Sequence, residues 1–198
     1  KIEAMPRMTT NPDAADQDTS QDTGLLRQDD AGVCTLTLNR PNARNALSLE
    51  TMEALQQILS AIAKDPSVRV VVMAANGPAF CAGHDMRQLR ANPTFEYYKT
   101  TFATSSSIMK TMLTMPQPII ARVHGMATAA GCQLVATCDL AIASTTAKFA
   151  TPGVHIGLFC STPMVALSRN VGRKAAMEML MLGEPVDAAR ALELGLVN

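Results

Sequence analysis

The stretch PIIARVHGMATAAGCQLVATCDLAIA, residues 118–143, carries the strongest signal for the fold. Its β-branched start at 118–123 predicts a strand, and the leading proline suits a strand's first position. Small residues at 125–131 predict a loop, which leads into a short helix at 132–138. Residues 140–143 predict the next strand. A strand, a helix and a strand in this order predict two parallel strands joined by a helical crossover.

The same alternation continues along the chain. Thr and apolar residues alternate over 33–38, which is typical of a half-buried strand. Ser48 is suited to cap a helix, and apolar residues then recur at helical spacing as far as Ile62. A further strand is predicted at 68–73, and further helices at 94–115, 173–182 and 187–195. The pattern predicts an α/β protein with a largely parallel sheet. The methionines with the spacing of a buried helical face are Met109, Met112, Met115, Met177 and Met181.

Composition argues against several kinds of partner. The formal net charge is zero, with 17 basic and 17 acidic residues and no basic stripe, so no nucleic-acid partner is expected. No apolar run approaches the ~20 residues that span a bilayer, and no secretory signal is expected. The five cysteines are scattered without metal-binding spacing. This scatter predicts reduced thiols, no metal site and a cytoplasmic location.

The chain divides into two parts of different composition. Residues 1–24 are polar and carry four aspartates, so they predict a flexible tail that buries too little apolar surface to order itself. Residues 25–198 predict one domain, because the chain is 47% apolar and long enough for a single core.

Two small-residue turns could carry chemistry. Ala82-Gly83-His84 follows a strand, and Ala129-Ala130-Gly131 precedes a helix. A helix start leaves backbone N–H groups unpaired, and two such groups from separate loops could stabilise a thioester carbonyl that gains negative charge. Small-residue loops are also common packing solutions, so either loop alone leaves both interpretations open. Neither the phosphate-loop nor the dinucleotide glycine pattern occurs.

Four sequence blocks, taken together, resemble a known family. Asn39-Arg40-Pro41 leads into Arg44-Asn45-Ala46-Leu47, and the next block is Phe80-Cys81-Ala82-Gly83-His84-Asp85-Met86. The remaining blocks lie at 123–140 and 147–158. In this order they resemble the signatures of the crotonase superfamily, the enoyl-CoA hydratases and isomerases, from about Ala31 to Asn198.

The resemblance implies a fold, a ligand and a site. The fold is a crotonase-like spiral of ββα units, and the ligand is an acyl-CoA thioester, so coenzyme A is part of the substrate and no separate cofactor is expected. The backbone N–H groups of His84 and Ala130 would form the oxyanion hole, and the Ala82 carbonyl would meet the adenine. A homotrimer or hexamer is implied. The positions expected to contact the substrate are Ala43, Arg44, Ala82, Asp85, Met86, Met126, Gly131, Pro152 and Leu158.

The chain departs from the family at the acid/base positions. Hydratases of this family carry two glutamates, and the matching positions here are Gln133 and Gly153. Hydration of a double bond needs one group to accept a proton and one to donate it, which neither residue can do. His155, two positions further on, is a candidate replacement catalytic base. The alternative is a histidine that is packed or hydrogen-bonded within its loop.

Family members generally continue past residue 197 into a C-terminal helical region that covers the acyl site. The sequence ends at Asn198, so the resemblance predicts a spiral that lacks this region and a pocket open on that side. Three functions stay open. One is an enzyme of the enoyl-CoA hydratase/isomerase type with weak or altered activity, the second is a non-catalytic acyl-CoA-binding or regulatory protein, and the third is a fold that serves only assembly.

Overall fold

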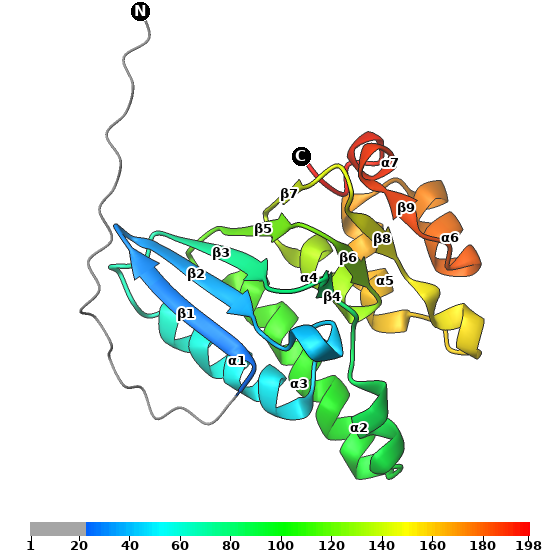
Figure 1. Ribbon diagram of the computed structural model, residues 1–198, viewed down its shortest axis with the longest axis horizontal. Helices are drawn as coiled ribbons and strands as arrows, with labels where there is room; N and C mark the ends of the chain where they lie inside the picture. The colour runs from blue at the N-terminus through cyan, green and yellow to red at the C-terminus, as the bar shows by residue number, and fades with distance from the viewer. Residues whose placement is uncertain (1–22) are drawn as a thin grey trace, which may run out of the picture.

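The fold is built on two β-sheets, seen in a computed structural model that describes residues 23–198 (Figure 1). The larger sheet has the strand order β1-β2-β3-β5-β7, and the smaller has the order β4-β6-β8-β9. The larger sheet consists of β1 (Leu25–Asp30), β2 (Val33–Leu38), β3 (Val70–Ala75), β5 (Ile119–Val123) and β7 (Leu140–Ala143). The smaller sheet consists of β4 (Ala79–Cys81), β6 (Met126–Thr128), β8 (Lys148–Ala150) and β9 (Val186–Asp187).

Consecutive strands are shared between the two sheets in a repeating way. The pairs β3–β4, β5–β6 and β7–β8 each give one strand to the larger sheet and the next strand to the smaller one. Within each sheet the repeated strands run parallel, with Met73 opposite Ala121 and Ala127 opposite Phe149 as examples. A helical segment follows each pair. This arrangement confirms the α/β class and the predicted spiral of ββα units.

Helices cover one face of the larger sheet and build the C-terminal side of the molecule. Figure 1 shows α1 and α3 side by side against this sheet, where Leu36, Leu55 and Ile108 are buried. Ser48 caps α1 as predicted, with its side chain accepting a hydrogen bond from the Thr51 amide. The helical segments are η1 (Pro41–Ala43), α1 (Leu49–Ile62), α2 (Met86–Ala91), α3 (Phe95–Thr114), α4 (Ala130–Thr137), η2 (Pro152–Ile156), α5 (Ser161–Asn170), α6 (Arg173–Leu182) and α7 (Ala188–Glu193).

Several predicted elements differ from the structure. Residues 126–128 form strand β6 rather than part of a loop, and α4 begins at Ala130 rather than at residue 132. A three-residue strand made of small side chains has too little periodicity to stand out in a sequence. The helices α2 and α5 were not predicted, and α7 ends at Glu193 before the expected residue 195.

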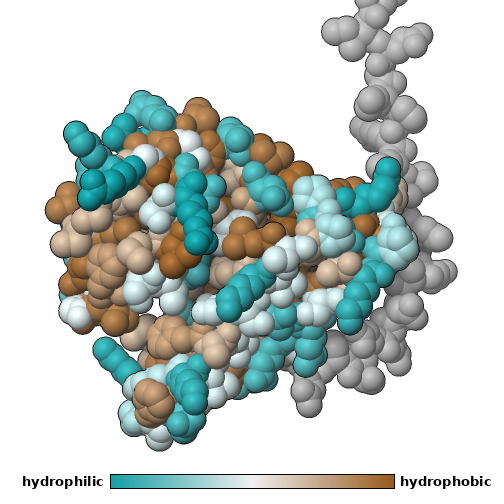
Figure 2. Space-filling model, turned by 180° about the vertical axis from the view of Figure 1, so that it is seen from behind, coloured by the Kyte–Doolittle hydropathy of each residue, from teal (hydrophilic) through white to brown (hydrophobic). Residues whose placement is uncertain are grey.

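The methionine prediction holds on one helix and fails on another. Met109 and Met112 on α3 are buried, whereas Met177 and Met181 on α6 are 49% and 56% exposed. The spacing is the same, but α6 lies at the surface of the C-terminal side and turns this face outward. Figure 2 shows hydrophobic side chains gathered on that side of the molecule.

The predicted polar tail lies outside the described residues, apart from Thr23 and Gly24. These two belong to the fold, because the Thr51 hydroxyl donates to the Thr23 carbonyl and the Asn39 amide donates to the Gly24 carbonyl. Among residues 23–198, no helix has both the length and the apolar character needed to cross a membrane.

Candidate active site

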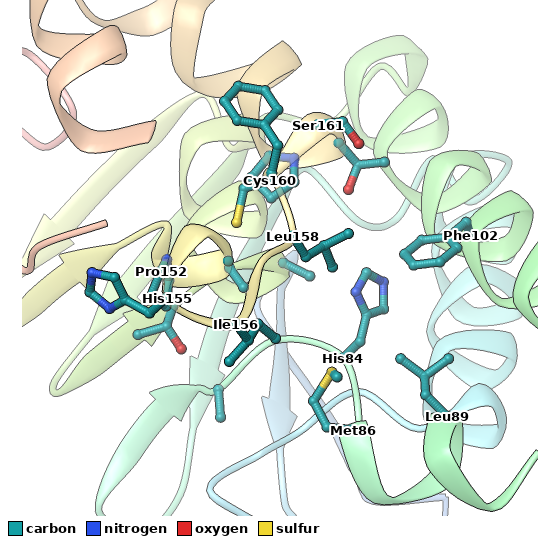
Figure 3. A pocket seen from close by; sticks show the side chains of 18 residues that line it. His84, Met86, Leu89, Phe102, Pro152, His155, Ile156, Leu158, Cys160 and Ser161 are labelled. Carbon is teal, nitrogen blue, oxygen red and sulfur yellow. The ribbon is translucent and has the colours of Figure 1, made fainter. Parts of the chain in front are cut away.

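An apolar pocket of about 610 Å³ lies where three segments meet. The segments are the turn after β4, the start of α4, and the stretch from η2 into α5, with Phe102 of α3 closing one side. Figure 3 shows His84 facing this space, with Leu158 and Ile156 on one side and Phe102 and Leu89 on the other. Apart from two histidines and Cys160, the wall has no titratable side chain among the described residues.

Two backbone amides flank the pocket. His84 and Ala130 both line it, and neither amide nitrogen donates a hydrogen bond within the described part of the chain. Their loops touch, because a Cβ placed on Gly83 would lie 3.2 Å from the Ala130 nitrogen and 3.0 Å from the Thr128 oxygen. Two unpaired N–H groups on touching loops are the kind of donor pair that an anionic oxygen needs.

Backbone geometry at the start of α4 explains why Ala130 stays unpaired. Ala129 has φ 50° and ψ −119°, a conformation that residues with a side chain rarely adopt. Its own amide donates to the Ala150 carbonyl of β8 at 2.9 Å. Two residues later, Gly131 packs so closely on β4 that a Cβ would collide with the Cys81 carbonyl oxygen. These contacts hold the first turn of α4 against both β4 and β8.

The His84 ring is a neutral side chain at the pocket wall. It packs edge-on against Phe102, with ring centroids 5.1 Å apart and planes at 76°. Its Nε2 atom is buried and has no hydrogen-bond partner among the described residues. Burial lowers the pKa of His84 from 6.5 to about 4, so the imidazole is uncharged at neutral pH.

Gln133 and Gly153, the positions expected to replace the family glutamates, are both closed to the pocket as acid/base sites. Gln133 does not line the pocket; it is 5% exposed on α4, and its Oε1 atom is buried without a partner. Gly153 does line the pocket, but a Cβ there would collide with the Leu158 carbonyl oxygen and lie 2.8 Å from the Cys160 sulfur. Neither position therefore offers a titratable group.

His155, the candidate replacement base, has structural partners, and Cys160 is a buried thiol. His155 Nε2 is 2.8 Å from the Leu182 carbonyl and 3.7 Å from the Glu184 carboxylate, so the ring is tied to the end of α6. Figure 3 shows the His155 side chain turned away from His84. Burial raises the pKa of the Cys160 thiol, which keeps it protonated and a poor nucleophile at neutral pH. All five cysteines are free and buried.

The predicted substrate contacts fall into two groups. Ala82, Met86, Pro152 and Leu158 line the pocket with His84. The residues that do not line it are Ala43, Arg44, Asp85, Met126 and Gly131.

Those that lie outside the pocket have roles in its surroundings. The Arg44 carbonyl accepts a hydrogen bond from the Ala82 amide at 3.0 Å, so the turn that contains Ala43 and Arg44 lies against one pocket segment. Asp85 is 3.1 Å from the Arg40 guanidinium and caps α2 by accepting hydrogen bonds from the Arg87 and Gln88 amides. This geometry gives Asp85 a structural role in orienting the turn that carries His84.

Several pocket residues were not found from the sequence. Phe102 belongs to α3. Leu89 and Ile156 belong to the short elements α2 and η2, which the sequence did not predict, and Phe159 lies in the loop between η2 and α5. Helical spacing would have placed Phe102 on one face of α3, but nothing in the sequence says that this face meets the turn after β4.

The fold and the site together define a class of protein. A spiral of ββα units with two unpaired amides at an apolar pocket is the architecture of the crotonase superfamily. The chain belongs to the enoyl-CoA hydratase/isomerase family, which it matches over residues 28–198.

Particular relatives share much of the sequence. Enoyl-CoA hydratase domain-containing protein 3, mitochondrial, of Xenopus laevis is 49% identical over 171 residues, which are 86% of this chain and 58% of that protein. The Homo sapiens protein of the same name is 47% identical over 167 residues, which are 84% of this chain and 55% of the relative. The chain therefore spans less than two thirds of the length of these curated relatives.

Solved structures agree with this relationship. A crystal structure of an enoyl-CoA hydratase from Mycobacterium smegmatis superposes with a TM-score of 0.86 at 59% identity, covering 88% of this chain and 68% of that one. The crystal structure of the human enoyl-CoA hydratase domain-containing protein 3 gives a TM-score of 0.85 at 44% identity, with 88% and 69% covered.

The expectation of a cytoplasmic protein is wrong. The curated relatives from frog, rat and human are named mitochondrial. The expectation rested on reduced cysteines, and free buried thiols do not distinguish one reducing compartment from another.

Proposed function

We propose that this chain binds acyl-CoA thioesters and stabilises a thioester enolate between the backbone N–H groups of His84 and Ala130. The observation that carries the proposal is the pair of unpaired amides on touching loops at one apolar pocket. An enolate places negative charge on the thioester oxygen, and preorganised N–H donors stabilise that charge without reorganisation. The apolar wall suits an acyl chain.

Hydration through the family's two carboxylates is not part of the proposed reaction. Gln133 cannot accept a proton, and Gly153 has no side chain. Positioned proton transfer is typically worth ~10²–10⁴ in rate, so we expect hydration of crotonyl-CoA to be weak or undetectable. The chemistry that remains is exchange of a proton next to the thioester. A base from the solvent, hydroxide or a buffer anion, takes the proton, the two N–H groups stabilise the enolate, and a solvent proton or deuteron returns to the same carbon.

The test measures enolate formation directly. Butyryl-CoA is incubated with the protein in D₂O, and deuterium uptake at the carbon next to the thioester is followed by NMR. Ala130→Pro removes one donor, and proline is tolerated at the first position of a helix. Loss of one such donor is expected to slow exchange by ~10²–10³.

Ala188→Pro is the matched control, because Ala188 is the first residue of α7 and lies outside the pocket. It should exchange like the unmodified protein. Exchange that is equally fast in the Ala130 and Ala188 variants would contradict the proposal. Circular dichroism checks that both variants fold.

A second candidate is a non-catalytic acyl-CoA-binding or regulatory protein. The observation that favours it is the pocket wall, on which the described residues supply no carboxylate. In that case butyryl-CoA binds saturably in a calorimetric titration while no deuterium is taken up.

Assembly into a homotrimer or hexamer is part of the proposal. The exposed hydrophobic side chains on the C-terminal side support it, among them Met177, Met181 and Leu182. Light scattering coupled to gel filtration measures the mass directly, and a monomer at all concentrations would contradict it.

A further inference from the structure

Two histidines and the hydroxyls of Thr128, Ser161 and Thr162 interrupt the apolar wall of the pocket. The His84 ring lies between Leu158 and Phe102, and its nearest lining neighbours Met86 and Leu89 are also apolar (Figure 3). The other histidine of the wall, His155, is already bonded to the Leu182 carbonyl. His84 is therefore the histidine through which this wall can offer an unused hydrogen bond, and it lies across the pocket wall from hydroxyls that can also bond a ligand.

The two ring nitrogens of His84 have different surroundings. Nε2 is buried without a partner, whereas Nδ1 makes no hydrogen bond and is not among the buried unpaired atoms of the described residues. Figure 3 shows one ring nitrogen turned toward Leu158 and the other toward Phe102. Nε2 thus points into the protein beside α3, and Nδ1 is the nitrogen that a ligand can reach.

The surroundings also decide where the ring proton sits. A buried N–H without an acceptor is rarer and less tolerated than a buried acceptor with an unused lone pair. The proton is therefore favoured on Nδ1, which leaves Nε2 as the unused acceptor. Because burial keeps the ring neutral, the His84 side chain presents a single uncharged N–H donor to the pocket.

We propose that His84 Nδ1 donates a hydrogen bond to an uncharged oxygen, a hydroxyl or a ketone, on the acyl group of the thioester, so that the pocket selects oxygenated acyl chains over unsubstituted ones. This inference rests on the proposed function, because it takes the His84 backbone N–H as a donor to the thioester oxygen. A carboxylate is excluded, since the described wall holds no cation to offset its desolvation.

The position of that oxygen follows from the length of the side chain. Four bonds join the His84 amide nitrogen to Nδ1, so the two nitrogens are at most about 5 Å apart. Two ligand oxygens held by these donors must be close along the acyl chain. The oxygen is therefore expected on the third to fifth carbon, counted from the thioester carbonyl.

The experiment compares matched thioesters by calorimetric titration. Butyryl-CoA is the unsubstituted reference, and the two enantiomers of 3-hydroxybutyryl-CoA and 4-hydroxybutyryl-CoA carry the oxygen. A hydrogen bond made in a dry site discriminates strongly against an analogue that lacks it. We expect at least one hydroxylated ester to bind about 10–100-fold more tightly than butyryl-CoA.

Two variants identify the donor. His84→Phe keeps the backbone amide and the ring contact with Phe102 but removes Nδ1. In this variant the affinities for the hydroxylated ester and for butyryl-CoA should differ by less than about threefold. His155→Phe changes the other histidine of the wall. If His155→Phe abolishes the preference and His84→Phe does not, the inference is overturned.

The remaining outcomes separate this inference from the proposed function. Equal affinity of the unmodified protein for butyryl-CoA and every hydroxylated ester would overturn the inference alone. Failure to bind any thioester would overturn both. If His84→Phe does not fold, imidazole ¹⁵N NMR of the unmodified protein replaces it: the preferred ester should shift the Nδ1 resonance, and no shift would count against the assignment.

Discussion

Single residues in and beside this pocket are held in conditions that cost stability. Ala129 adopts a positive φ that favours glycine, and His84 and Gln133 each bury a polar atom without a partner. Strain and unsatisfied polar atoms of this kind persist where the surrounding structure holds them, and they concentrate at functional sites. Each can be tested by a substitution at one position.

His84 should make stability depend on pH. Its folded pKa of about 4 lies below the ordinary value of 6.5, so between these values the unfolded chain binds the proton and the folded protein does not. The contribution is fully present above pH 6.5 and is lost as the pH falls toward 4. It should amount to about 2–3 kcal/mol.

The measurement is urea unfolding at several pH values between 4 and 7. As the pH falls from 7 to 4, the unfolding free energy of the His84→Phe variant should decrease less steeply than that of the unmodified protein. His124→Phe is a control, because that histidine is exposed, bonds the Gly77 carbonyl, and does not line the pocket. Parallel curves for the His84 variant and the unmodified protein would show that the ring is not a neutral buried group.

Gln133 should be replaceable by an apolar residue of similar shape. Its Oε1 atom is buried and unpaired, and removing such an atom without leaving a cavity is neutral or stabilising. Gln133→Met should therefore keep or raise the unfolding free energy by up to about 1 kcal/mol in urea unfolding. Gln133→Glu should lower it, because a carboxyl would be buried there. A large loss in the methionine variant would mean that the amide has a partner in solution.

Short elements, rather than long ones, place the groups of the site. The strands β4, β6 and β8 have three residues each, and they fix the turns that carry His84 and Ala130. The segment η2 forms the opposite wall and ends at Gly157 in the left-handed region. Such short elements are held in place by the sheets and helices that surround them. Their sequences can therefore differ widely from ordinary strand or helix patterns.

A carboxylate cannot be restored to η2 by substitution at residue 153 alone. A Cβ at residue 153 would collide with the Leu158 carbonyl oxygen. That carbonyl cannot easily move away, because the Leu158 amide donates a hydrogen bond to the Gly153 carbonyl at 2.9 Å. Gly153→Glu should move η2 and lower the unfolding free energy by roughly 1–3 kcal/mol.

Thermal unfolding and crotonyl-CoA hydration are measured together. Gly157→Ala provides a comparison in the same segment, because a Cβ at Gly157 meets no atom within 4 Å and its cost arises from φ +74° alone. If Gly153→Glu keeps full stability and gains hydration activity, then η2 can move to make room for a side chain at residue 153, and this prediction is wrong.

At the scale of the whole molecule, the pocket depends on the alternation of strands between two sheets. Because β3 and β5 join one sheet while β4 and β6 join the other, the turns after β4 and β6 come together at the same place. Residues 83 and 130, far apart in sequence, become neighbours in this way. The C-terminal side remains rich in exposed hydrophobic side chains, from Ile156 on η2 to Leu192 on α7.

The sequence by itself determined the class of fold, the long helices and the turns that carry the two amides. These features are local: the alternating apolar patterns, the Ser48 cap and the small-residue turns each involve residues close together in the chain. Local features of this kind can be recognised from the sequence alone. Family signatures led to the proposed acyl-CoA ligand and the proposed backbone donors, and they drew attention to Gln133 and Gly153 at the positions where carboxylates were expected.

Only the tertiary structure decided what surrounds those donors. The sequence could not show that Gln133 lies in the core, that Gly153 has no room for a side chain, that His155 bonds the end of α6, or that the His84 ring faces Phe102. Each of these facts depends on contacts between residues distant in the chain. Packing of that kind leaves no periodic trace in the sequence, because it is fixed by the relative placement of elements rather than by the pattern within any one of them.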